Sequence, residues 1–176
     1  ISQISFIFLG FSMGNSTGIA GGLLYILMHG LAKGGLFLCA GIVEQNMGTK
    51  DITKLGGLIK TMPVTAIAFL FCAFSVMGIP PFGGFFSKYM VIAGAIENNQ
   101  IAIALTFFAG AIFTILYLLR VFVLVFLGDS KMNPVKEKST TMVSSAALLA
   151  VLSLAGGIFI KYLSSLVTLA VRQMLG

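Results

Sequence analysis

The sequence GIPPFGGFFSK at residues 78–88 interrupts a segment that is otherwise apolar from Lys60 to Glu97. Lys88 is the only charged residue between those two ends. Proline supplies no backbone N–H and glycine no side chain, so a helix should not run unbroken through this stretch. At membrane depth, irregular backbone is tolerated only where protein or a water-filled cavity surrounds it. The stretch therefore predicts two half-helices that meet near a hydrated site inside a membrane.

The composition is that of an integral membrane protein. Hydrophobic residues make up 58% of the 176 residues, charged residues 9%, and the mean hydropathy is +1.06. The net charge of +6 comes mostly from lysines in two loops and forms no basic face interleaved with aromatics, which argues against nucleic acid as a partner. Cys39 and Cys72 lack metal-ligand spacing, and we expect both to be buried. Because the chain starts at Ile1 with a short polar segment, we expect it to be part of a longer protein.

Hydropathy and segment length predict an all-α, polytopic transmembrane helix bundle. A helix needs about 20 apolar residues to cross the hydrocarbon core. No segment shows the period-two alternation of a transmembrane strand. The expected helices cover about residues 1–14 (too short for a whole span), 19–45, 62–97 with a break at 78–84, 101–127 and 141–171.

The loop lysines predict the topology. They cluster in two loops, as Lys50, Lys54 and Lys60 in one and Lys131, Lys136 and Lys138 in the other. Both loops fall on one side only if the broken segment counts as a single crossing. Its second half, residues 85–96, is about 18 Å long and too short to span about 30 Å of hydrocarbon. The positive-inside rule then places both lysine loops in the cytoplasm and residues 98–100 and the C-terminus outside.

Three polar residues share one face of the helix expected at residues 19–45. His29 and Lys33 are four residues apart, and Glu44, eleven residues beyond Lys33, returns to nearly the same direction. A lysine near the middle of a span marks a functional site, here a candidate proton relay. The structural alternatives are that His29 caps a carbonyl of a neighbouring helix and that Glu44 only marks the cytoplasmic interface.

Lys88 is expected at a similar depth, about 13 Å from the outer end of its segment. A lysine in apolar surroundings can release and take up a proton, which makes Lys88 a second candidate relay. The alternative is a side chain that snorkels to the interface. We interpret Arg120 as a snorkelling anchor and Lys161 and Arg172 as outer-interface residues.

The sequence lacks the motifs of bound cofactors. It has one histidine, two separated cysteines, and no GxGxxG or P-loop pattern. We therefore expect no cofactor, no redox chemistry and no ATP chemistry in this chain.

The motifs together resemble those of one membrane family. They are His29-xxx-Lys33 followed by GGLF, GIVE at residues 41–44, GTKDITKLGGL at 48–58, Met62-Pro63, and GIPPFGGFFSK at 78–88. From Ser2 to about Gly128 the chain resembles the C-terminal part of the antiporter-like subunits of respiratory complex I, Mrp-type cation/proton antiporters and membrane-bound hydrogenases.

This resemblance implies a fold of about fourteen helices with two inverted repeats, each with a discontinuous helix. The chain would be the second repeat without its start, plus the last helix. By resemblance, Lys33 matches the central lysine of a hydrophilic axis, His29 its neighbouring histidine, and Lys88 the lysine near the outward proton exit.

Two functions stay open. The first is a proton-translocating subunit of a redox-driven complex, of complex I or membrane-hydrogenase type, in which Lys33, Lys88, His29 and Glu44 carry protons. The second is a subunit of a secondary Mrp-type sodium/proton antiporter. A purely structural anchor is disfavoured by the intramembrane lysines. Expected partners are other membrane subunits, including homologous antiporter-like subunits, the lipid bilayer, and protons or sodium ions. The expected location is a prokaryotic cytoplasmic membrane.

Overall fold

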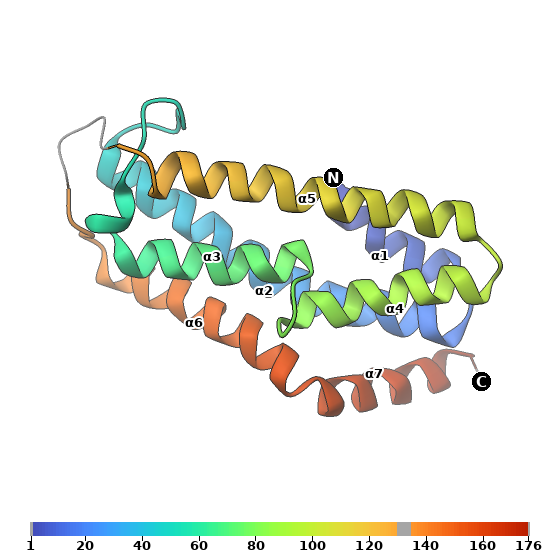
Figure 1. Cartoon of the computed structure of the whole chain (residues 1–176). Helices are drawn as coiled ribbons and strands as arrows, with labels where there is room; N and C mark the ends of the chain where they lie inside the picture. The colour runs from blue at the N-terminus through green and yellow to red at the C-terminus, as the bar shows by residue number, and fades with distance from the viewer. Residues whose placement is uncertain (1, 130–134, 176) are drawn as a thin grey trace.

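The computed structural model describes residues 2–129 and 135–175, and within them the chain forms an elongated helical bundle (Figure 1). The helices are α1 (Ser2–Ser12), α2 (Ser16–Met47), the 3-10 helix η1 (Leu58–Lys60), α3 (Pro63–Met77), α4 (Gly83–Glu97), α5 (Ile101–Phe126), α6 (Thr140–Ile158) and α7 (Ile160–Leu175). The described residues contain no strand, and α2, α5 and α6 are long and apolar enough to cross a membrane. The predicted all-α transmembrane fold is confirmed.

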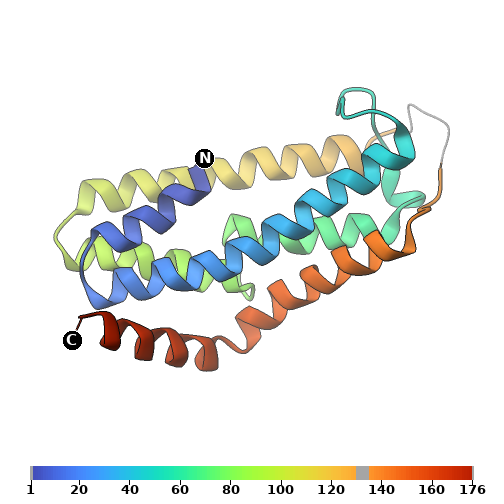
Figure 2. The same cartoon turned by 180° about the vertical axis from the view of Figure 1, so that it is seen from behind.

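Helix α2 is the central element of the bundle (Figure 2). Its 32 residues extend about 48 Å, and it contacts α1, α3, α4, α6 and α7. The side chain of Asn15 caps its start by accepting the N–H of Gly18. Gly48 ends it in the left-handed conformation, with its N–H donated to the carbonyl of Glu44. Polar residues along α2 therefore face neighbours over the whole length of the bundle.

Helices α3 and α4 form one interrupted crossing (Figure 1). Each has 15 residues, or about 22 Å, and they lie end to end along α2. Gly84 allows the two halves to approach, because a Cβ there would collide with the carbonyl oxygen of Ser75. The predicted discontinuous helix is confirmed, with helical structure ending at Met77 and resuming at Gly83.

The segment expected as one helix at 141–171 is instead two helices. Helix α6 ends at Ile158 and α7 begins at Ile160. The bend lies against the α3–α4 break, since a Cβ on Gly157 would collide with the carbonyl oxygen of Pro81. Consecutive glycines at 156–157 weaken the helix and permit this contact. The expectation of one continuous helix therefore needs correction.

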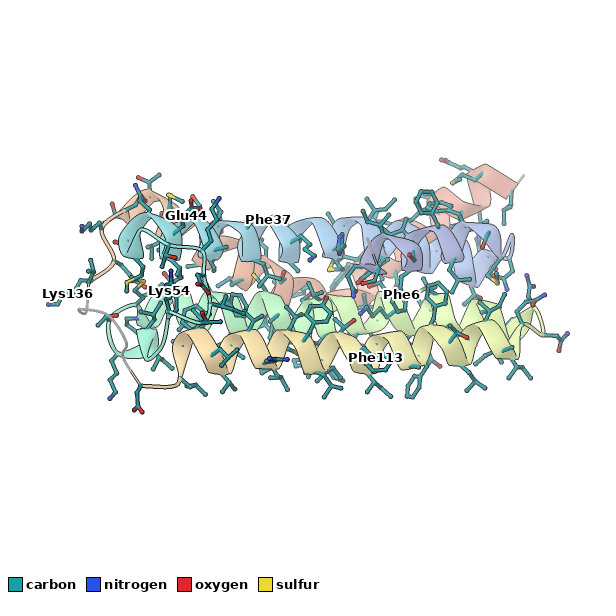
Figure 3. The ribbon with its side chains drawn as sticks, turned by 90° about the horizontal axis from the view of Figure 1, so that it is seen from above. Phe6, Phe37, Glu44, Lys54, Phe113 and Lys136 are labelled. Carbon is teal, nitrogen blue, oxygen red and sulfur yellow. The ribbon has the colours of Figure 1, made fainter. Side chains whose placement is uncertain are left out.

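The ends of the bundle agree with a single broken crossing. Glu44, Lys54 and Lys136 lie at one end (Figure 3), and the α4–α5 turn lies at the other (Figure 1). Lys131 falls outside the described residues. Which end faces the cytoplasm stays a prediction.

The largest buried apolar cluster draws on α2, α3, α5 and α6 and includes Cys39 and Cys72, which are buried as expected.

Candidate functional site

Lys88 lies buried at the junction of the two half-helices. The residue is 4% exposed, and its Nζ donates a hydrogen bond of 2.7 Å to the carbonyl oxygen of Val76. That carbonyl is in the last turn of α3, where carbonyls lack intrahelical partners and the helix dipole attracts cations. The side chain therefore turns toward the break, and it does not snorkel toward the interface.

Two aromatic rings complete the surroundings of the Lys88 ammonium. The ring centroids of Phe6 and Tyr25 lie 4.7 Å and 5.7 Å from Nζ. An ammonium near an aromatic face is attracted by the ring quadrupole, most strongly where water is excluded. No carboxylate among the described residues pairs with Lys88. Its charge thus depends on a backbone carbonyl, a helix dipole and two aromatic rings.

Tyr25 links the surroundings of Lys88 to the polar face of α2. The buried Tyr25 ring lies 5.4 Å from the ring of His29, centroid to centroid. Nδ1 of His29 is buried and has no hydrogen-bond partner within the described part of the chain. A buried polar atom of this kind needs a partner, and water is able to supply one.

Lys33 is one helical turn beyond His29 on α2 and is half-buried. Tyr25, His29 and Lys33 follow one another at intervals of four residues and form a single stripe. Lys88 approaches the Tyr25 end of this stripe from α4. Tyr25 was absent from the sequence-predicted site, although its position four residues before His29 could have identified it.

A second buried polar group joins three helices beside Lys88. The hydroxyl of Tyr25 donates to Oε1 of Gln3 at 2.7 Å, and Nε2 of Gln3 donates to Oγ1 of Thr114 at 2.8 Å. The Thr114 hydroxyl in turn donates to the carbonyl of Gly110 at 2.9 Å. Helices α1, α2 and α5 are therefore held together by a satisfied polar network that also fixes the Tyr25 ring.

Glu44 lies apart from this group. It is exposed near the end of α2 and pairs with Lys50 at 3.3 Å (Figure 3). Along the helix it is about 16 Å from Lys33. In the adjacent loop, hydrogen bonds from the side chain and backbone of Thr53 hold the pKa of Asp51 below its usual value. The structure thus places Glu44 at an exposed polar end of the bundle and does not bring it to Lys33 or Lys88.

Comparisons with known proteins agree on one family. Residues 1–114 match the family described as NADH:quinone oxidoreductase/Mrp antiporter, TM. The chain is 38% identical over 131 residues to a Na(+)/H(+) antiporter subunit of Alkalihalophilus pseudofirmus, covering 74% of this chain and 27% of that protein. It is 36% identical over 121 residues to an NADH-quinone oxidoreductase subunit of Desulforudis audaxviator, covering 69% of this chain and 24% of that protein. The matched part is thus about a quarter of either relative.

Two solved structures share the fold of nearly all of this chain. A chain of the Mrp complex from Dietzia sp. superposes with a TM-score of 0.93 at 27% identity, covering 98% of this chain and 41% of that one. A chain of respiratory complex I from Thermus thermophilus with bound NADH superposes with a TM-score of 0.83 at 28% identity. The match covers 97% of this chain and 37% of that one. Sequence match, relatives and fold together show that the chain belongs to the NADH:quinone oxidoreductase/Mrp antiporter transmembrane family.

Proposed function

We propose that the chain forms part of a proton-translocating, antiporter-like subunit of a redox-driven membrane complex, of complex I or membrane-hydrogenase type. Protons move along a hydrophilic axis that contains Lys33, His29 and Lys88. The observation that carries this proposal is the burial of Lys88 between two half-helices, bonded to the carbonyl of Val76. A lysine in such a position at membrane depth is rare outside ion pathways.

The surroundings of Lys88 suit a group that changes its charge. The carbonyl end of α3 and the faces of Phe6 and Tyr25 favour the ammonium form. The amide end of α4 and the apolar surroundings favour the neutral amine. Because these influences oppose one another, a small movement at the break shifts the proton affinity of Lys88.

The rings of Tyr25 and His29 determine the proposed path of protons from Lys33 to Lys88. His29 offers a buried Nδ1 that has no hydrogen-bond partner among the described residues, and the Tyr25 ring lies near both His29 and Lys88. The hydroxyl of Tyr25 is committed to Gln3, which restricts the motion of the ring. We propose that water joins Lys33 to His29 and that transfer to Lys88 follows when water passes the Tyr25 ring.

A subunit of a secondary Mrp-type sodium/proton antiporter is the second candidate. The TM-score of 0.93 with the Mrp complex and the 38% identity to a Na(+)/H(+) antiporter subunit favour it. In either case the proposed partners are other membrane subunits, including homologous antiporter-like subunits, and the transported ions are protons or sodium. Bacterial relatives support a prokaryotic cytoplasmic membrane as the location.

Replacing Lys33 by alanine in the full-length protein, within its complex, tests the proposal. In proteoliposomes with a pH-sensitive dye, we expect proton translocation to fall by about a hundredfold or more. The matched control is Lys60→Ala, because Lys60 is an exposed lysine at the end of η1 without an ion pair among the described residues. Native rates in the Lys33 variant, with normal assembly, would remove Lys33 from the axis. Driving the same vesicles by electron donors or by a sodium gradient separates the two candidates.

A further inference from the structure

We propose that the exposed polar face of α7 is a docking surface for a transmembrane helix of a partner subunit, one that carries a carboxylate opposite Lys161. The proposal rests on the chain being a subunit of a membrane complex. It is independent of proton translocation by Lys33 and Lys88.

The polar face of α7 is a continuous stripe. Lys161, Ser165, Thr168 and Arg172 recur at intervals of four, three and four residues, which places them on one side of the helix. All four are exposed, and with Ser164 they line a shallow cleft of about 370 Å³. The hydroxyl of Thr168 donates a hydrogen bond to the carbonyl of Ser164, so this donor already has a partner within α7. The two cations have no acidic partner among the described residues.

Lys161 lies deeper than the outer interface where the sequence placed it. The α6–α7 bend packs on the α3–α4 break at Pro81, near the middle of the bundle (Figure 1). Lys161 is the second residue of α7, directly after the bend, whereas Arg172 lies about 16 Å further along α7 toward the far end. A lysine at this depth is unfavourable against lipid and acceptable against a polar or anionic protein group.

An apolar strip next to the stripe provides packing area. Tyr162, Leu166 and Leu169 repeat at helical spacing and are exposed. Val171 is the only buried residue of α7 within the described residues, and α7 contacts only α2 and α6 appreciably. The helix thus offers a partner one apolar strip and one cationic strip side by side.

The charge pattern selects the partner. The five acidic residues of this chain are Glu44, Asp51, Glu97, Asp129 and Glu137, and all lie in loops or at helix ends. A second copy of the described residues would therefore bring cations, and no carboxylate, to the depth of Lys161. Anionic lipid headgroups sit at the surface, where they reach Arg172 but not Lys161. A carboxylate on a neighbouring membrane helix satisfies both the depth and the charge.

Photo-cross-linking in the intact complex tests the surface. A photoreactive phenylalanine analogue at Leu166 is expected to form an adduct with a different membrane subunit. The matched control is the same group at Phe113, an equally exposed aromatic on α5 (Figure 3). Adducts at Leu166 only with lipid, or only within its own polypeptide, would overturn the proposal.

Charge variants of Lys161 test the carboxylate. Lys161→Glu should reduce co-purification of the cross-linked subunit about tenfold, and Lys161→Arg should retain it, while Lys60→Glu serves as the control. Lys161→Gln provides the same test without adding a negative charge inside the membrane. Unchanged co-purification of both the glutamate and glutamine variants would refute a carboxylate partner for Lys161.

Discussion

Replacing Lys88 by methionine should preserve the fold and abolish proton transfer at the α3–α4 break. The substitution removes the hydrogen bond to the carbonyl of Val76, which as a charged bond is worth about 1.5–3 kcal/mol. It also removes the contacts with Phe6 and Tyr25, worth up to about 2 kcal/mol. Against these losses, a lysine at the membrane centre costs about 2.5–3.5 kcal/mol, a cost that methionine of similar length avoids. The net change in the free energy of unfolding should therefore lie within about 2.5 kcal/mol of zero.

The assay compares assembly, stability and transport for the same protein preparation. The full-length variant is purified in its complex, its thermal stability is measured by size-exclusion chromatography after heating, and proton uptake is followed in proteoliposomes. We expect normal assembly and no transport.

Lys88→Arg is the decisive companion variant. Guanidinium keeps the charge and can still donate to Val76, but it does not release its proton in the working pH range. It should fold and fail to transport. An arginine variant that translocates protons at the native rate would refute a proton-releasing role for Lys88, and a methionine variant that fails to assemble would show that its main role is to hold the break together.

Two further predictions concern packing and topology. Gly84→Ala should destabilise the protein by about 1–3 kcal/mol, because its Cβ meets the backbone of α3, whereas Gly110→Ala, where nothing lies within 4 Å, should be neutral or stabilising in the same heat-challenge assay. Equal effects of the two alanines would argue against a close α3–α4 contact. Cysteines at Lys54 and Asn98 should react with an impermeant thiol reagent from opposite sides of the membrane, with only Asn98 labelled on intact cells, and labelling of both from one side would contradict the single broken crossing.

Much of the fold follows from local sequence. Apolar segments of spanning length predict the helices, and the glycines and prolines at 78–84 predict the break, because both effects act within a few residues. The α6–α7 bend was not predicted. Its apolar segment has spanning length. Glycine is common in membrane helices, so Gly156 and Gly157 did not by themselves indicate a bend. The bend depends on what those glycines touch in space.

The candidate site was predicted in part. Lys33 and Lys88 stand out because charges are rare in apolar segments, and His29 stands out by its spacing from Lys33. Tyr25 and Gln3 did not stand out, since a tyrosine or glutamine in a membrane helix has many ordinary roles. Their importance appears only in the folded chain, where the Tyr25 hydroxyl is bonded to Gln3 and the Tyr25 ring lies near both Lys88 and His29.

The sequence by itself determined that this is a membrane helix bundle with one interrupted crossing and two intramembrane lysines, since hydropathy, chain breaks and isolated charges are local properties. Only the tertiary structure decided what the lysines meet. In the folded chain, Lys88 donates a hydrogen bond at the end of α3 and Glu44 forms an ion pair with Lys50. The cationic stripe of α7 is exposed. These outcomes depend on contacts between residues far apart in the chain, and such contacts are set by how complete helices pack against one another.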